Sequence, residues 1–448
     1  MVCAGALLWQ SGVAQAVPNF ARQTGEPCAA CHVGAFGPQL TRLGRAFKIG
    51  GYTQGGGEGP GANIPLSAML LGSFSNTQKD LPAGSQPEHY GRNNNFSMDQ
   101  ISIFLAGRVN DNIGGFIQGT FEGVGSAFSL DNADLRLTKA FDVGGDELRM
   151  GMSVNNNPTV QDPYNSTFAW GFPYVASGFG LTPAATPALD GGLGGNSVGT
   201  TVYGWYDRRI YGEFGIYNTL PPGTLKALGT AYGPGSTAGP AFYGRAAYEW
   251  NWNDQSAHVG ALFLQSRFNP SMGDRSASGD MGRDTYTDFA VDAGYQFLPE
   301  GDHAITAYGI YTYERQNLRG TFAGSGMVSG NNLNNFRLNL SYFYQNTYGL
   351  TLGWQKIWGS TNPTIYTSGA NDGTNSASGS PNSNAFIIQA DWSPFGKEKS
   401  WGSPWANLKL GAQYVAYTQF NGGTSNYDGF GRSASANNTL FLFAWLAF

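Results

Sequence analysis

The sequence predicts an all-β fold, a transmembrane outer-membrane β-barrel of about 16 antiparallel strands. Charged residues make up only 12% of the 448 residues, whereas 14% are aromatic and 66 are glycine. A soluble protein usually has about 25% charged residues. No apolar run reaches the roughly 18 residues that a transmembrane helix needs. From residue 65 onward, segments of about ten to fifteen residues instead show period-2 alternation between turn signals.

Sixteen such segments follow one another, and the connections between them alternate in length. Short connections fall at residues 110–112, 142–146 and 299–301, and long ones at 157–196, 220–239 and 360–383. Short periplasmic turns and long outer loops are typical of outer-membrane barrels. An even strand count places both ends of the barrel on the periplasmic side. The expected strands begin near Pro65, Phe96, Ile113, Ser129, Glu147, Ser197, Arg209, Pro240, Gln255, Asp284, Asp302, Asn332, Thr347, Asn384, Trp405 and Asn437.

The last segment carries the clearest barrel signal. Its apolar residues alternate and end in a terminal aromatic residue: Leu440, Leu442, Ala444, Leu446 and Phe448. This resembles the C-terminal strand by which outer-membrane barrels are recognised for insertion. The alternative, a soluble β-sandwich, explains neither the alternating connections nor the Tyr and Trp residues near strand ends. The sequence therefore predicts a protein of the bacterial cell outer membrane, in contact with its lipid.

The N-terminus has the features of an exported chain. A short apolar stretch at residues 4–9 precedes Ala14-Gln15-Ala16, an A-x-A cleavage site. This predicts a signal peptide over residues 1–16, although the usual basic residues before the apolar stretch are missing. A buried N-terminal helix is the alternative.

Cys28-Ala29-Ala30-Cys31-His32 has the C-x-x-C-H spacing by which a c-type haem is attached. The two thiols form thioethers with the porphyrin, and the histidine gives the iron one axial nitrogen. The alternative is a redox-active dithiol, but that motif requires a βαβ context that the surrounding pattern lacks. Cys3 would leave with the signal peptide, so no disulfide framework is expected. The sequence predicts one covalently attached haem c, held by Cys28 and Cys31, with His32 on the iron.

Residues 17–53 form the predicted monohaem cytochrome segment, residues 54–64 a Gly-rich linker and residues 65–448 the barrel. Pro38 is expected to start a helix that Gly50-Gly51 ends. The apolar face of this helix consists of Leu40, Leu43 and Phe47, and its basic positions are Arg42, Arg45 and Lys48. Either the apolar face lies on the porphyrin with the cations near the propionates, or the helix packs on barrel wall with a solvated basic side. So short a segment cannot form an adequate core alone.

Period-2 geometry assigns the two faces of the first strand. One face, expected to meet lipid, has Leu66, Ala68, Leu70 and Phe74, and the luminal face has Ser67, Met69, Leu71, Ser73 and Ser75. Barrel closure places the last strand beside the first, where its luminal face adds Phe441, Phe443 and Trp445. We expect the cytochrome segment to dock in the lumen against this seam. Met69 is then the candidate distal iron ligand, with His258, His89 or an open position as alternatives, whereas His303 is expected to face out.

The segment resembles a known family in the residues Pro18-Asn19-Phe20-Ala21-Arg22-Gln23-Thr24-Gly25, Cys28 to His32, Leu40, Gly44-Arg45-Ala46-Phe47-Lys48 and Gly51-Tyr52-Thr53. It is similar to the fused outer-membrane cytochrome–porins of iron-oxidising bacteria. The specific match covers residues 18–53, and the remainder agrees in architecture only. The resemblance implies a single haem, bound through Cys28, Cys31 and His32, that takes electrons from extracellular Fe(II). It also implies a periplasmic electron carrier, a cytochrome or a cupredoxin, as the acceptor.

Other functions stay open at this stage. The electron donor or the direction of transfer could differ, or the barrel could be a solute porin with a haem-bearing plug. An enzyme acting on a soluble substrate is disfavoured, because no Ser-His-Asp, zinc or carboxylate constellation appears, and the net charge of -5 gives no support to a nucleic-acid function. The enzymatic activity that the resemblance implies is Fe(II) oxidation. The outer-loop carboxylates are expected to be solvated turn residues: Asp162, Asp190, Asp274 and Asp280.

Overall fold

The computed structural model describes residues 18–58, 64–230, 235–270, 282–322, 330–397, 402 and 405–448. The predicted signal peptide (residues 1–16) and the second half of the predicted linker lie outside the described residues. Asp274 and Asp280 lie outside them as well.

Sixteen long strands form one closed antiparallel sheet, which confirms the predicted barrel. Every strand begins within two residues of its predicted start. A further strand, β8 (Ser236–Thr237), has two residues and pairs with β10, while β7 pairs directly with β9. The barrel strands are β1 Leu66–Thr77, β2 Asn95–Arg108, β3 Ile113–Glu122, β4 Ala127–Val143, β5 Asp146–Asn155, β6 Ser197–Tyr206, β7 Ile210–Thr219, β9 Ala241–Trp252, β10 Gln255–Asn269, β11 Asp284–Phe297, β12 His303–Leu318, β13 Gly330–Tyr344, β14 Tyr348–Gly359, β15 Ser383–Trp392, β16 Asn407–Gln419 and β17 Thr439–Ala447.

The first and last strands close the barrel. Leu70 pairs with Leu446 and Phe74 with Leu442, while β1 pairs with β2 on its other side. Along β1 every second residue is buried, in the order predicted, with Ser67, Met69 and the luminal serines inside. The predicted faces of the first strand are therefore confirmed.

The outer surface of the barrel is apolar along most of its strands. Its exposed large side chains include Leu105, Leu137, Phe214, Val291 and Leu352, whereas serine, threonine, asparagine and charged residues dominate the buried inward positions. A closed sheet leaves no unpaired backbone groups at an edge, which is what a lipid environment requires. The chain is thus a transmembrane β-barrel of the outer-membrane type. None of the helices in the described part of the chain has the length and apolar character to cross a bilayer.

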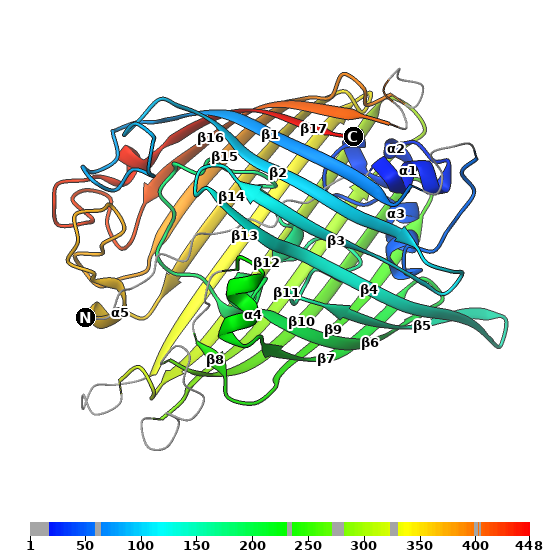
Figure 1. Ribbon diagram of the computed structural model, residues 1–448, viewed down its shortest axis with the longest axis horizontal. Helices are drawn as coiled ribbons and strands as arrows, with labels where there is room; N and C mark the ends of the chain where they lie inside the picture. The colour runs from blue at the N-terminus through cyan, green and yellow to red at the C-terminus, as the bar shows by residue number, and fades with distance from the viewer. Residues whose placement is uncertain are drawn as a thin grey trace.

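Three short helices precede the barrel: α1 (Pro18–Thr24), α2 (Cys28–Cys31) and α3 (Arg42–Ile49), with a 3₁₀ turn, η1 (Val33–Ala35), after α2. They lie together at the end of the barrel where the C-terminus is found (Figure 1). The predicted helix start at Pro38 is wrong. The Thr41 side chain accepts a hydrogen bond from the Gly44 backbone N–H and so caps the helix, while Leu40 pairs with His32 in an isolated β-bridge.

The long connection between β5 and β6 folds into the lumen instead of standing outside as predicted. It contains a 3₁₀ turn, η2 (Phe168–Trp170), and a short π-helical turn, η3 (Ala188–Gly192). Val160, Tyr164 and Trp170 are buried within it. We call residues 156–196 the inward loop. The remaining connections carry α4 (Pro222–Ala227), α5 (Pro363–Tyr366) and a 3₁₀ turn, η4 (Ala434–Asn437).

Candidate haem site

Cys28, Cys31 and His32 line one cavity of about 850 Å³, a volume that includes its solvent-open part. Three parts of the chain complete the wall. Phe20 and Phe47 come from the helical segment, Phe104, Phe116 and Gln118 from β2 and β3, and Asn165 and Trp170 from the inward loop.

The haem motif is held in one helical turn by its own backbone. His32 N–H donates to the Cys28 carbonyl at 2.9 Å, and Thr41 N–H donates to the Cys31 carbonyl at 3.0 Å. Helix α3 therefore crosses the motif in backbone contact. A Cβ on Gly44 would lie 2.3 Å from the Cys31 carbonyl oxygen, so only glycine fits there. The sequence thus places both thiols and the imidazole in a fixed arrangement.

The protonation states of these groups suit a c-type haem. Burial raises the pKa of the Cys31 thiol to about 12, and the charges of Glu26 and Cys28 add to the effect. Burial also raises the pKa of Cys28, against a hydrogen bond with Asn407. Burial lowers the pKa of His32 to about 4. The imidazole is therefore neutral near pH 7, which is the form that ligates iron. The two thiols and the neutral imidazole are the groups that a c-type haem requires, and the aromatic side chains of the cavity wall suit its apolar ring.

Met69 lies outside the lining of this cavity. Its side chain is buried in an apolar cluster with Phe36, Leu71 and Trp445. Phe104 belongs to both this cluster and the cavity wall. Among the described residues that line the cavity, His32 is the one histidine and no methionine occurs. Ligation by Met69 stays a prediction.

The other three histidines also lie away from the cavity lining. His258 stacks on Tyr164, with ring centroids 4.0 Å apart. His89 is exposed in the connection between β1 and β2, beside Glu88. His303 is exposed and pairs through Nδ1 with the Tyr342 hydroxyl, which agrees with its predicted outward position.

The seam between β1 and β17 forms the apolar wall that we expected, but the helical segment fills it with a side chain. Phe36 packs there, and its ring centroid lies 4.8 Å from that of Trp445. The cavity that contains the haem motif faces β2, β3 and the inward loop instead. The helical segment therefore contacts the seam through Phe36 and, in α1, through Asn19, whose backbone N–H donates to Ser67 Oγ on β1 at 3.0 Å, whereas the motif faces away from it.

Helix α3 is fixed to the barrel wall by buried polar contacts. Arg45 Nη2 lies 2.6 Å from Glu249 Oε1, and the two side chains are 5% and 4% exposed. Arg45 Nη1 also donates to Gln296 Oε1 at 2.7 Å. Of the two arrangements left open by the sequence, packing on the wall is correct for this part of the helix. The basic side, however, is buried at Arg45 and Lys48 and solvated only at Arg42.

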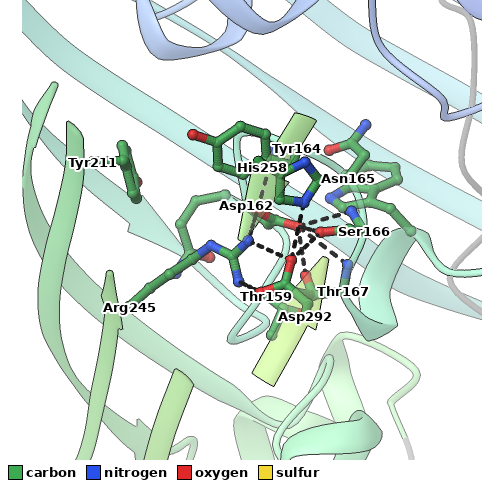
Figure 2. Close-up of polar contacts among 12 residues, drawn as sticks. Thr159, Asp162, Tyr164, Asn165, Ser166, Thr167, Tyr211, Arg245, His258 and Asp292 are labelled. Carbon is green, nitrogen blue, oxygen red and sulfur yellow. Dashed lines mark hydrogen bonds and ion pairs between the residues drawn. The ribbon is translucent and has the colours of Figure 1, made fainter. Parts of the chain in front are cut away.

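A charged network fixes the inward loop to the same part of the barrel wall, strands β9 to β11. Arg245 Nη2 lies 3.0 Å from both Asp162 Oδ1 and Asp292 Oδ2, and His258 Nε2 lies 3.2 Å from Asp292. Figure 2 shows Arg245 pointing between the two carboxylates, with Ser166 and Thr167 beside them. The Asp162 carboxylate also accepts the Ser166 and Thr167 backbone N–H groups at 2.9 and 3.1 Å.

The prediction that Asp162 and Asp190 are solvated turn residues is therefore wrong. Asp162 has no exposed surface, and Asp190 forms an ion pair with Arg337. Both carboxylates serve as counterions for arginines that project from the barrel wall into the lumen. Such pairing is what makes a buried charge tolerable.

The inward loop and the helical segment meet inside the barrel. Gln39 Nε2 donates to the Tyr174 hydroxyl at 2.6 Å, and Asn165 Nδ2 donates to the Pro38 carbonyl at 2.8 Å. The helical segment enters the lumen from the end of the barrel where the C-terminus lies. The inward loop enters from the other end, where it connects β5 to β6. Residues of both line the cavity that holds the haem motif.

Several cavity residues were not predicted from the sequence. Gln118, Asn165 and Trp170 carry no spacing signal of their own. The density of aromatic residues between 164 and 174 was the available signal for the inward loop, because so many aromatic side chains suit a buried segment better than a solvated one. Within the described chain, no group of three or more His, Cys, Asp and Glu side chains is arranged to hold a metal ion.

No protein-family model and no curated protein matches this chain. Among solved structures it is similar to OmpT, an outer membrane protein of Vibrio cholerae, with 10% identity, a TM-score of 0.41 and coverage of 86% of this chain and 96% of that chain. It is similar to the outer membrane channel DcaP of Acinetobacter baumannii, with 11% identity, a TM-score of 0.44 and coverage of 86% and 96%. Salmonella typhi OmpF, in complex with daunomycin, matches with 13% identity, a TM-score of 0.40 and coverage of 86% and 97%.

Proposed function

We propose that this chain is an outer-membrane electron-transfer protein that carries one c-type haem on Cys28, Cys31 and His32. In this proposal the haem takes electrons from extracellular Fe(II) and passes them to a periplasmic carrier, a cytochrome or a cupredoxin. The observation that carries the proposal is the cavity inside the barrel, since all three residues of the attachment motif line it together.

The haem supplies one-electron redox chemistry when bound, and the chain supplies position and shelter. His32 provides a neutral nitrogen, and the Arg45–Glu249 pair holds α3 against the wall. Phe47, Phe116 and Trp170 give the cavity an aromatic wall. Each Fe(II) ion that becomes Fe(III) gives up one electron, and each one-electron carrier accepts one. The barrel lumen lets donor and acceptor approach from opposite sides of a hydrocarbon layer that is thinner than about 30 Å.

Fe(II) is named as the donor because of the resemblance of residues 18–53 to cytochrome–porins of iron-oxidising bacteria. Oxidation at the cell surface also makes physical sense, because Fe(III) products are poorly soluble and would accumulate inside a cell. The test is stopped-flow mixing of the purified protein with Fe(II) while the visible spectrum is recorded. Reduction of the haem by Fe(II) supports the proposal. Reduction by dithionite but not by Fe(II) would point to a different donor or direction.

A solute porin with a haem-bearing plug is the second candidate, because the sixteen-strand barrel is an architecture that can pass solutes. The helical segment and the inward loop, which meet inside the barrel through Gln39–Tyr174 and Asn165–Pro38, favour the conduit instead. Conductance in planar bilayers separates the two functions. Large open-channel currents from the intact protein would favour the porin, and a closed pore favours the electron conduit.

A further inference from the structure

Lys48 is a buried cation in the wall of the candidate haem cavity. It is 4% exposed and comes from the last turn of α3. Its Nζ donates to the Val160 carbonyl at 2.7 Å and to Asn165 Oδ1 at 2.6 Å. Nζ also lies 4.7 Å from the centroid of the Trp170 ring. An ammonium group has three N–H donors, so neutral oxygens of the inward loop use two of them.

Lys48 has no carboxylate within 4.0 Å among the residues that the structure describes. The acidic groups that act on it over longer distances are Asp162, Asp134 and Glu213. Asp162 is already paired with Arg245, and Asp134 with Arg136 at 2.8 Å. A buried charge without a counterion is costly, and the group responds by shifting its pKa. Burial, with repulsion from Arg136, lowers the pKa of Lys48 to about 7.

The remaining cavity wall does not supply the missing counterion. Among the described residues that line the cavity, Lys48 is the one cation and Glu26 the one carboxylate. No ion pair joins these two residues in the described structure. A haem carries two carboxylates, its propionates, and a charge-assisted hydrogen bond to an ammonium is stronger than a neutral one. The wall is thus electrostatically incomplete in a way that an anionic ligand would complete.

We propose that Lys48 binds a propionate of the haem and raises the midpoint potential of the iron. This inference rests on the proposed function, because it requires the haem. Oxidation adds a positive charge to the iron centre, and a nearby fixed cation disfavours that state, more strongly in a buried site than in water. Lys48 is a positioning residue here, since it also joins the haem segment to the inward loop through Val160 and Asn165.

The proposal has a pH signature with a defined sign. A bound carboxylate favours the charged ammonium, so the pKa of Lys48 lies higher in the haem-loaded protein than the value of about 7 in the haem-free chain. Loss of that proton as the pH rises removes the positive charge. The midpoint potential is therefore expected to fall as the pH rises through this higher pKa, which lies above about 7. The charged groups that face Lys48 are Asp134 and Arg136 on β4, Asp162 in the inward loop and Glu213 on β7.

Spectroelectrochemical titration of the intact haem-loaded protein between about pH 6 and about pH 10 tests the inference. We expect Lys48→Met to lower the midpoint potential by the equivalent of about a tenfold change in the redox equilibrium, which is about 59 mV for one electron. This variant should also lose the pH dependence. Lys48→Arg should keep the high potential without the pH dependence, because arginine stays charged. Arg42→Met is the matched control, since Arg42 is an exposed cation on the same helix.

Equal potentials and equal pH slopes in the Lys48→Met and wild-type proteins would overturn the inference and leave the haem function intact. If the Lys48→Met protein does not fold or does not bind haem, the titrations of the wild-type and Lys48→Arg proteins still test whether Lys48 sets the pH dependence of the potential. A wild-type potential that does not change above pH 7, or a pH slope that survives in Lys48→Arg, would refute the role of Lys48. Wild-type protein that binds no haem would instead refute the proposed function itself.

Discussion

Docking of the haem segment should depend on one buried ion pair, Arg45–Glu249. Glu249→Ala removes the carboxylate and leaves the Arg45 guanidinium with neutral acceptors only: Gln296 Oε1 at 2.7 Å, Leu40 O at 3.0 Å and Ser256 Oγ at 3.2 Å. Breaking a buried pair on one side typically costs about 3–5 kcal/mol. Because Arg45 keeps these hydrogen bonds, we expect the loss in docking free energy to lie near the lower end of this range, at about 3 kcal/mol. The population of undocked segment should then rise by roughly a hundredfold.

Limited proteolysis with trypsin measures this population directly. Arg45 and Lys48 are both buried in the docked segment, so cleavage there requires undocking. When docking and undocking are faster than cleavage, the cleavage rate follows the undocked fraction. Glu249→Ala should therefore be cut about a hundred times faster than wild type after the two buried sites, Arg45 and Lys48. Bilayer recordings should show open-channel events in the same variant.

A matched control separates this effect from a general loss of charge. Glu147 pairs with Arg149 at 2.7 Å, but these side chains are 31% and 25% exposed. Such partly exposed pairs contribute about 0–1 kcal/mol, so Glu147→Ala should be cut at nearly the wild-type rate. The double variant Arg45→Met/Glu249→Leu should restore docking, because apolar replacement of both partners leaves no unpaired charge. Equal cleavage of Glu249→Ala and Glu147→Ala would refute the reasoning.

Three further outcomes are expected at the haem motif. Gly44→Ala forces α3 away from the Cys31 carbonyl, at a cost of about 1–3 kcal/mol of stability. It should lower the temperature at which the protein unfolds, followed by the absorbance of the haem. Gly212→Ala, where the added methyl group meets open space, should not lower it. Burial raises the pKa of Cys31 from 9.0 to about 12. At pH 8, Cys31 of the haem-free chain should therefore have roughly a thousandfold less thiolate than a cysteine in an unfolded peptide, and should react with iodoacetamide far more slowly. Equal reaction rates of the chain and the peptide would exclude this burial. Met69→Ala should lose about 2–5 kcal/mol of stability, because Met69 is buried in the apolar cluster that contains Phe36. If Met69 is also the distal ligand, the variant loses its low-spin haem spectrum, and an unchanged spectrum eliminates this ligand.

The barrel could be predicted from the sequence almost completely because its signals are local and repeated. Alternation with period 2 fixes the face of each residue, and turn residues fix the ends of the strands. On β1 this reasoning placed Ser67, Met69 and Leu71 in the lumen, as observed. The haem motif could be recognised for a similar reason, since Cys28, Cys31 and His32 are adjacent in sequence and in space.

The rest of the site depends on contacts between residues far apart in the chain. Asp162 was assigned to a solvated turn because the sequence does not show that Arg245, on a strand of the barrel wall, reaches it. The same is true of Glu249, which pairs with Arg45 although 204 residues separate them in the chain. The helix start was missed for a local reason, since the capping side chain of Thr41 competes with the proline signal at Pro38.

The inward loop changes how the lumen is understood. From the sequence, we expect the long connections to stand outside the barrel and only the haem segment to enter the lumen. In the structure the loop meets that segment through Tyr174 and Asn165, and Trp170 contributes to the cavity wall. In the proposed electron transfer, an extracellular donor would therefore meet the inward loop before the haem motif. The loop is thus part of the candidate site and not a surface connection.

The central claim is that one haem is covalently attached to Cys28 and Cys31. Pyridine-haemochrome absorbance of the purified membrane protein, together with the intact mass of the chain, tests it most directly. We expect one haem per polypeptide, retained after denaturation and absent from the Cys28→Ala/Cys31→Ala variant. A colourless wild-type chain, or haem that separates from the chain on denaturation, would contradict the claim.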